Sequence, residues 1–287
     1  MQTSQIEFVK LAPEHLDGAL ALSRQAKWPH RLEDWAMLLS LSTGFVALND
    51  GKVAGTTLLT RYGNNVGAIN MVIVDEALRG QGVGRRLMDA ALAECGDREC
   101  RLTATSEGLP LYKKLGFVET GAILQHQGVI ANGGNSGDHR PVVWATSTDL
   151  SDCTALDHAA SGLERSSLIS RLAEDGRIAV LRRDGRLLGF AALRTFGRGE
   201  LAGPVVATTL EEAKALLSFL FAARPGAFMR VDTNDTSGLA PWLADHGLAH
   251  VGGGISMRKG GSASSGASDV QTFAPPQTFA LASQALG

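Results

Sequence analysis

Hydrophobic and polar positions along the first half of the chain follow two periods, one typical of strands and one of helices. Short apolar runs rich in β-branched residues predict strands near residues 6–11, 44–49, 52–61, 67–74 and 99–105. Apolar residues spaced three and four apart predict helices near residues 14–26, 31–41, 82–95 and 107–115. A long strand near residues 117–130 completes the series. This order of elements predicts a domain that mixes helices and strands.

The same order of elements recurs in the second half of the chain, which indicates an internal repeat. Residues 51–55 and 185–189 share a Gly-basic-x-x-Gly pattern, typical of a hairpin turn that leads into a strand. The other matched segments are 82–95 with 209–222, 99–105 with 228–232, and 108–117 with 238–248. The sequence therefore predicts two tandem copies of one fold.

Turn-forming residues at 132–138 suggest where the first copy ends and the second begins. We therefore expect one domain over residues 1–135 and a second over residues 136–259. The remaining residues, 260–287, begin with a glycine- and serine-rich stretch that is typical of a flexible linker. They end in an apolar segment, and we expect its Phe279 and Leu281 to dock on the protein.

A glycine-dense loop joins the strand near 67–74 to the helix near 82–95. Glycines let backbone N–H groups approach a ligand closely, and a helix start presents unpaired N–H donors, so this loop is suited to a diphosphate. Arg79, Arg85 and Arg86 add positive charge for the same anion. The spacing excludes a dinucleotide fingerprint, because Arg85 or Leu87 stands where the third glycine should be, and no P-loop lysine is present. An oxidoreductase with a bound dinucleotide is thus disfavoured.

Two motifs point to one known family. The spacing Arg79-x-x-Gly82-x-Gly84 resembles the acyl-CoA pyrophosphate loop of the GNAT superfamily of N-acetyltransferases. Downstream, residues 108–117 resemble the GNAT helix that ends in Tyr-x-Lys-x-Gly-Phe, here Tyr112 to Phe117. The resemblance covers roughly residues 5–131. It implies an α+β fold class of two tandem GNAT (acyl-CoA N-acyltransferase) folds, each with a central, mostly antiparallel sheet flanked by helices.

The resemblance also implies the chemistry. Acetyl-CoA would be the co-substrate, with direct transfer of the acetyl group to a primary amine of a small molecule or peptide, and no metal. A backbone N–H of the strand before the loop would polarise the thioester carbonyl, and Tyr112 would protonate the leaving thiolate. The residues implied around acetyl-CoA are Val72, Ile73, Val74, Arg79, Gly80, Gln81, Gly82, Val83, Gly84 and Arg85. A regulatory protein that binds CoA without turnover is the alternative from another class.

The general base is left open by the sequence. The residues considered for it are His30, Asn70, Asp75, Glu76, Glu107 and His126, and none is assigned; for Asp75 we expect a role in shaping the turn. Tyr62 is the reserve candidate for the acid. In the region that sets acceptor specificity, we expect Trp35 in the core and Trp28 at the rim of the acceptor site.

The second copy serves as an internal control for these assignments. Residues 203–209, which correspond to the glycine-dense loop, have neither its glycine cluster nor a cationic residue, and Leu243 stands in the place of Tyr112. We therefore expect this degenerate GNAT-like domain not to be catalytic. Three roles are left open for it: completing the substrate cleft, stabilising a homodimer, or binding an effector.

Composition and charge further narrow the functional classes to which the chain could belong. The chain has 287 residues and a formal net charge of -2, so no overall field attracts nucleic acid or a membrane surface. No apolar run is long enough to span a bilayer. Cys95, Cys100 and Cys153 lack metal-ligand spacing, and we expect three small, buried, unpaired residues in a reducing, cytoplasmic compartment.

Overall fold

The computed structural model describes residues 6–130, 141–261 and 275–287. The first half contains β1 (Ile6–Lys10), η1 (Pro13–His15), α1 (Leu16–Gln25), α2 (Leu32–Ser40), β2 (Ser42–Asn49), β3 (Lys52–Tyr62), β4 (Val66–Val74), η2 (Glu76–Leu78), α3 (Val83–Cys95), β5 (Glu99–Ala104), α4 (Leu109–Lys114) and β6 (Val118–Val129). Every strand and helix expected in residues 6–130 is present, with ends that differ by a few residues.

The second half repeats this series. It contains β7 (Val142–Trp144), η3 (Ser147–Asp149), α5 (Leu150–Ser161), α6 (Ser166–Asp175), β8 (Gly176–Arg183), β9 (Arg186–Phe196), β10 (Gly199–Ala207), α7 (Leu210–Ala222), β11 (Phe228–Asn234), α8 (Ala240–Asp245), β12 (Ala249–Lys259) and the additional β13 (Gln277–Ala280). The predicted internal repeat is therefore confirmed at the level of secondary structure.

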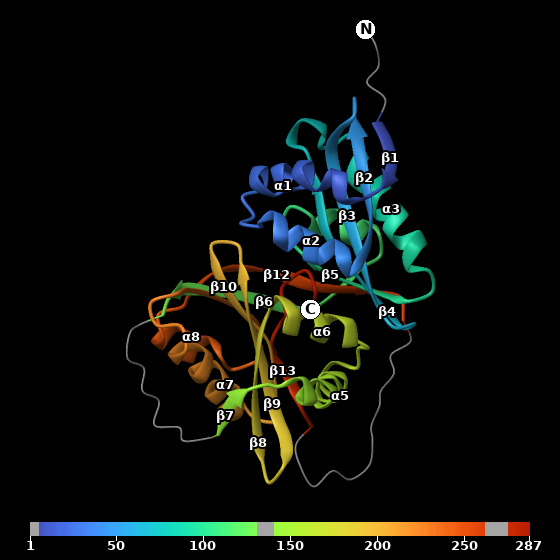
Figure 1. The fold of residues 1–287 in the computed structure, drawn as a ribbon. Coiled ribbons are helices and arrows are strands. Elements are labelled where there is room, and N and C mark those ends of the chain that lie inside the picture. The colour runs from blue at the N-terminus through green and yellow to red at the C-terminus, as the bar shows by residue number, and fades with distance from the viewer. Residues whose placement is uncertain (1–5, 131–140, 262–274) are drawn as a thin grey trace.

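The two halves share one sheet because they exchange their last strands. Within the described residues, thirteen strands run in the order β1-β2-β3-β4-β5-β12-β6-β11-β13-β10-β9-β8-β7. Strand β12 of the second half lies between β5 and β6, and β6 of the first half pairs with β11. Figure 1 shows β6 and β12 crossing the middle of the molecule. The exchange ties the halves together through backbone hydrogen bonds.

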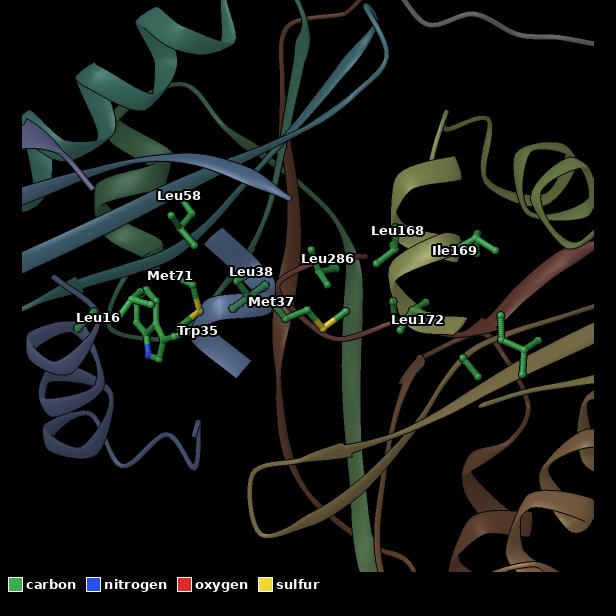
Figure 2. Close-up of a cluster of buried hydrophobic side chains, with 14 of the residues drawn as sticks. Leu16, Trp35, Met37, Leu38, Leu58, Met71, Leu168, Ile169, Leu172 and Leu286 are labelled. Atoms are coloured by element: carbon green, nitrogen blue, oxygen red, sulfur yellow. The ribbon is translucent and has the colours of Figure 1, made fainter. Parts of the chain in front are cut away.

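An apolar core also joins the halves. Trp35 and Leu38 on α2 belong to the same buried cluster as Leu168 and Leu172 on α6, and Figure 2 shows Met37 of α2 extending towards Leu172. Trp35 is fully buried, as expected, and its Nε1 donates to Ser23 Oγ at 2.9 Å. Burial of this kind stabilises by about 1.5–3 kcal/mol for each large apolar side chain. The halves are therefore packed as one body.

Strands β4 and β5 diverge after a short parallel start. They pair only where residues 66–68 of β4 face residues 99–101 of β5. Further along β4, Met71 and Val72 stand opposite Thr57 of β3, which makes a β-bulge, and Met71 has a left-handed φ of 50°. The bulge bends β4 away from β5 and leaves a cleft between the two strands.

In the second half, the corresponding gap is filled by the C-terminal segment. Strands β10 and β11 are parallel partners only near Leu201, and β13 lies between them further along, antiparallel to both. Phe279 and Leu281 are 5% and 8% exposed, so their expected docking is confirmed. The stretch expected as a linker lies mostly in residues 262–274, and the expected domain boundary lies in residues 131–140; both fall outside the described residues.

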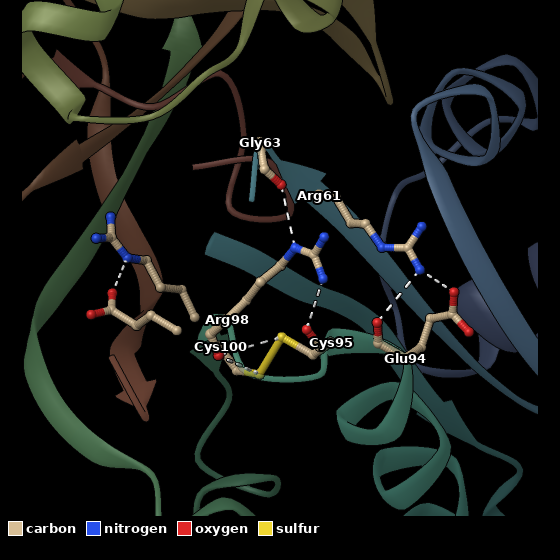
Figure 3. Close-up of a disulfide and its surroundings, with 8 residues drawn as sticks. Arg61, Gly63, Glu94, Cys95, Arg98 and Cys100 are labelled. Carbon is tan, nitrogen blue, oxygen red and sulfur yellow. Dashed lines mark hydrogen bonds and ion pairs between the residues drawn. A yellow bond between two sulfur atoms is a disulfide. The ribbon is translucent and has the colours of Figure 1, made fainter. Parts of the chain in front are cut away.

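Two of the three cysteines differ from the expectation. Cys95 at the end of α3 and Cys100 in β5 are joined by a disulfide, with their Cα atoms 6.7 Å apart (Figure 3). Arg98, in the turn between them, donates to the carbonyl oxygens of Cys95 and Gly63 at 3.1 and 3.3 Å. The expectation of an unpaired thiol was thus wrong for Cys95 and Cys100, because a tight turn returns the chain between them. Cys153 is buried and free.

Candidate active site

The glycine-dense loop folds as a turn followed by a helix start. Asp75 shapes the turn, as expected, because its Oδ1 accepts from Ala77 N at 2.9 Å. Gly80 and Gly82 have φ values of 76° and 82°, which side chains other than glycine rarely adopt, and a Cβ at either would meet nothing within 4 Å. Helix α3 then begins at Val83. Its first N–H groups have no partner within the helix and are available to an anion.

A cavity of about 790 Å³ lies between the diverging strands, beneath this loop; we call it the β4–β5 cleft. The expected site residues that line it are Val72, Ile73, Val74, Arg79, Gly80, Gly82, Gly84, Arg85 and Tyr112. Two expected residues are placed differently. Gln81 donates through Nε2 to Ala77 O at 3.1 Å, and Val83 is 2% exposed and packs beside Leu87 under the loop.

Arginine side chains stand at the mouth of the cleft. Arg79 lies 3.7 Å from both Glu76 and Glu107, and Arg85 pairs with Asp89 at 3.0 Å. All of these side chains are substantially exposed. Exposed ion pairs contribute roughly 0–1 kcal/mol, so a phosphate can displace them at small cost.

Tyr112 faces the cleft from α4. Its ring packs edge-on against Phe117, with centroids 6.1 Å apart, and lies over Gly108, where a Cβ would come within 2.8 Å of Tyr112 Cε2. Tyr112 is 7% exposed, and burial raises its pKa to about 12. The hydroxyl is therefore protonated at neutral pH and can act as a hydrogen-bond donor in the cleft.

A second cavity, of about 260 Å³, adjoins the first; we call it the interdomain cavity. Lys27, Trp28 and Thr105 line both cavities. The first half contributes residues 69–71 of β4 and residues 27–30 to its walls. It also contributes Asp34, Leu38, Thr103, Thr105 and Gln125. The second half and the C-terminal segment contribute Arg194, Phe196, Arg198, Arg230, Ser283 and Gln284, among others. Trp28 thus lies where the cavities meet, consistent with a rim position.

The candidates for the general base are scattered. His30 and Asn70 line the interdomain cavity, Glu76 and Glu107 line the β4–β5 cleft, and His126 packs against His250 with ring centroids 5.6 Å apart. Burial lowers the pKa of His30 to about 4, and its Nδ1 is buried without a partner among the described residues.

Tyr62, the reserve candidate for the acid, makes a hydrogen bond that holds another part of the chain. Tyr62 is 4% exposed, and its hydroxyl donates to Leu286 O at 2.5 Å, which holds the C-terminal segment. It is not among the described residues that line either cavity.

The interdomain cavity contains residues that sequence reasoning missed. Arg194 and Arg230 lie in strands of the second half, which we treated as non-catalytic, and Gln284 lies in the C-terminal segment. No local pattern marks these residues, because they reach the site through strand exchange and domain packing.

The helix that corresponds to α3 is capped by its own side chains. At the start of α7, Thr209 Oγ1 accepts from Glu212 N at 3.2 Å, and Glu212 Oε2 accepts from Thr209 N at 3.0 Å. With β13 seated between β10 and β11, the second half lacks the space of the cleft seen in the first. The capping box also occupies two N–H groups at the start of α7 and places the Glu212 carboxylate there.

Comparison with known proteins agrees with this geometry. Residues 12–117 match the model of the acetyltransferase (GNAT) family, and residues 153–271 match that of an acetyltransferase (GNAT) domain. The uncharacterized N-acetyltransferase YitH of Bacillus subtilis is 30% identical over 231 residues, which are 79% of this chain and 81% of that protein. The chain therefore belongs to the GNAT family of N-acetyltransferases, with two GNAT domains in tandem.

A further relative and two solved structures are similar to most of the chain. Mycothiol acetyltransferase of Clavibacter michiganensis subsp. michiganensis is 28% identical over 223 residues, 68% of this chain and 72% of that protein. A putative acetyltransferase from Pyrococcus horikoshii superposes with a TM-score of 0.80 at 17% identity, covering 100% of this chain and 98% of that one. A tandem GNAT protein from the clavulanic acid biosynthesis pathway gives a TM-score of 0.64 at 17% identity, covering 90% and 100%. These structures show the shared fold.

Neither a metal-binding cluster nor a membrane-spanning helix is present in the described residues. No group of three or more His, Cys, Asp or Glu side chains in the described ranges could hold a metal ion. Among the described helices, none has the length and apolar character to cross a membrane.

Proposed function

We propose that this N-acetyltransferase moves an acetyl group from acetyl-CoA to a primary amine of a small molecule or peptide by direct transfer. The observation that carries the proposal is the junction of two cavities. A cleft with an anion-binding loop at its mouth and Tyr112 inside it opens into a second cavity that can hold the acceptor. An arrangement of this kind brings two substrates together without a covalent acyl-enzyme.

Acetyl-CoA fits the β4–β5 cleft by its chemistry. Its diphosphate would sit on the N–H groups of residues 80–84, with Arg79 and Arg85 beside it. Its extended arm would run along Val72 to Val74, and the thioester would then reach the bulge at Met71. Since a bulge interrupts the ladder between β3 and β4, N–H groups there are free to polarise the thioester carbonyl.

The reaction needs few groups. The neutral amine attacks the thioester carbon, the new C–N bond forms, and the C–S bond breaks. The proton of the amine leaves to solvent or a base, and Tyr112 provides the proton that the departing thiolate takes up. The Tyr112 phenolate then regains a proton from solvent, which completes the cycle. The site of attack would lie near Thr105, which lines both cavities.

The second domain would have no coenzyme of its own and would complete the acceptor site. Its cleft is filled by β13, and its residues Arg194, Phe196 and Arg230 face the interdomain cavity. Of the three roles that the sequence left open, this is the one that the placement of residues supports.

The direct test is turnover. The protein is incubated with acetyl-CoA and a panel of primary amines, and both CoA release and acetylated product are measured. The proposal expects both, and expects Tyr112→Phe to lose turnover. Tight CoA binding with no product across the panel would instead favour the CoA-binding regulator.

A further inference from the structure

The walls of the interdomain cavity carry an excess of positive charge. Among the described residues that line it, Lys27, Arg194, Arg198 and Arg230 are cationic, and Asp34 is the one carboxylate. In a cavity of about 260 Å³, such an excess favours an anionic occupant.

The one carboxylate is already neutralised. Asp34 Oδ1 accepts from Arg31 Nη2 at 2.8 Å, and its Oδ2 accepts from Arg31 Nε at 3.2 Å and from Gly197 N at 3.0 Å. Burial by itself would raise the pKa of Asp34, but these hydrogen bonds hold it below its usual value. Arg31 is thus the bidentate partner of Asp34.

Arg194 is left without a dedicated counter-ion. It is 5% exposed, and its Nη1 approaches Asp34 Oδ1 only to 3.5 Å. Its Nε is buried and has no partner within the described part of the chain. The other carboxylate that acts on it, Asp175, accepts from Arg171 at 2.8 Å. Burial lowers the pKa of Arg194 to about 10, so the guanidinium is still charged at neutral pH. A buried charge of this kind is costly unless a ligand pairs with it.

A second guanidinium, that of Arg230, lies near the same aromatic ring. The Cζ atoms of Arg194 and Arg230 lie 4.9 and 5.1 Å from the centroid of the Phe196 ring. Arg230 is held in place by Asp232, through bonds of 2.8–3.1 Å from its Nε and Nη2. The charge of Arg230, although paired with Asp232, is among the causes that lower the pKa of Arg194. An oxyanion that pairs with Arg194 near Arg230 would offset this repulsion. Phe196 and His30, with ring centroids 5.4 Å apart, supply an apolar surface next to this position.

We propose that the acetyl acceptor is a small amine that carries a carboxylate or phosphate group, and that Arg194 and Arg230 hold this group. The inference rests on the proposed function, since it concerns the acceptor of that reaction. With the anion at the two arginines, the amine would point towards Thr105, where the interdomain cavity meets the β4–β5 cleft. The positive surroundings also disfavour the ammonium form of the amine, which favours the neutral nucleophile that the reaction needs.

The test compares amines in pairs that differ only in the anionic group. The pairs are phenylalanine with 2-phenylethylamine, γ-aminobutyrate with butylamine, and phosphoethanolamine with ethanolamine. CoA release gives kcat/KM for each. In one kind of pair, we expect kcat/KM for the anionic member to exceed that for the neutral member by at least about 30-fold. This is the size of effect expected from one buried charge pair. A preference in the carboxylate pairs identifies an amino acid, and a preference in the phosphate pair identifies an amino phosphate.

Variants of Arg194 test whether this residue causes the preference for anionic amines. In Arg194→Met, the ratio of kcat/KM values within the preferred pair should fall towards one. Arg194→Lys keeps the charge but loses the planar fork, so it should retain an intermediate ratio. Arg224→Met is the matched control, because Arg224 is an exposed partner of Glu200 and lines neither cavity. It should leave the ratio unchanged. If Arg194→Met does not fold by circular dichroism, Arg198→Gln replaces it, since Arg198 is exposed, and a smaller loss of preference is expected.

A binding measurement separates this inference from the proposed function. Calorimetry with 3-phenylpropionate and with phosphate, in the absence of coenzyme, should show binding that weakens in Arg194→Met. Turnover of amines with no preference within any pair would overturn the inference and leave acetyl transfer intact. Absence of turnover with every amine, together with anion binding that depends on Arg194, would overturn the proposed function and keep the anion site.

Discussion

Arg194 Nη1, on β9 of the second half, lies 3.5 Å from Asp34 Oδ1 on α2 of the first. Gly197 N donates to the same carboxylate, and Arg31 Nη2 donates to Thr195 O at 3.1 Å. These contacts cross from one half to the other at the wall of the interdomain cavity. The stability of the interface and the shape of the acceptor site therefore depend on the same side chains.

Replacing Asp34 tests that dependence. Asp34→Ala leaves Arg31 and the N–H of Gly197 without their acceptor and removes the carboxylate nearest to Arg194, and we expect a loss of about 2–4 kcal/mol in the free energy of unfolding. Denaturant unfolding provides the measurement. Glu211→Ala, which removes an exposed partner of Lys214, should cost less than about 0.5 kcal/mol. Equal effects from the two variants would mean that Asp34 does not hold the interface.

A control glycine separates the role of Gly82 in CoA binding from the backbone strain that a substitution there would cause. Gly82 and Gly185 have φ values of 82° and 78°, and a Cβ at either would meet nothing within 4 Å. Valine at either position should therefore destabilise the protein to a similar extent, by about 1–3 kcal/mol. Only Gly82→Val should weaken CoA binding, by roughly 10-fold or more, because its Cβ stands where the diphosphate would lie. Calorimetric titration with CoA measures this difference, and unchanged affinity in Gly82→Val would refute the loop assignment.

Tyr112→Phe keeps the ring and removes the proton donor. Turnover should fall by roughly 10²–10⁴-fold, with acetyl-CoA affinity little changed. Tyr62→Phe is the matched control, since that hydroxyl bonds Leu286 O; it should cost about 1 kcal/mol of stability and leave turnover near normal. Near-normal turnover in Tyr112→Phe, with chemistry shown to limit the rate, would assign Tyr112 a packing role.

Protonation of His30 should destabilise the fold at mildly acidic pH. Burial lowers the pKa of His30 to about 4, against an ordinary value of 6.5. Because the pKa is depressed in the folded state, this contribution to stability is fully present above about pH 6.5 and is lost as the pH falls towards 4. Between these values, wild type should lose on the order of 2 kcal/mol more than His30→Gln. His126, whose pKa is also lowered by burial, titrates in both proteins, so the difference between their unfolding curves isolates His30.

The C-terminal segment should be part of the folded unit. Phe279 packs in the core of the second half, and Phe279→Ala should cost about 3–5 kcal/mol. The matched control is Val143→Ala, because Val143 is 55% exposed and its replacement should cost little. Limited proteolysis provides a further check: ready removal of the last ten residues from the native protein would contradict the docking of β13.

Local features of the fold were accessible from the sequence. Helix α3 was expected at residues 82–95 and runs from Val83 to Cys95, because apolar spacing and the preceding glycines are encoded within a few residues. The loss of the glycine cluster in the second copy could also be read from a few neighbouring residues. In the structure, a capping box formed by Thr209 and Glu212 stands at the corresponding helix start. The disulfide was missed, since cysteine spacing alone does not reveal the turn that joins Cys95 to Cys100.

The sequence by itself determined the repeat, the order of helices and strands, and the glycine loop, since each depends on backbone preferences and periodicity between near neighbours. Only the tertiary structure decided which strands are exchanged, that β13 fills the second cleft, and that Arg194 and Arg230 reach the cavity beside Asn70. These outcomes depend on contacts between residues more than a hundred positions apart, such as Asp34 with Arg194. Such contacts are selected by the packing and hydrogen bonding of whole elements, which no local pattern contains.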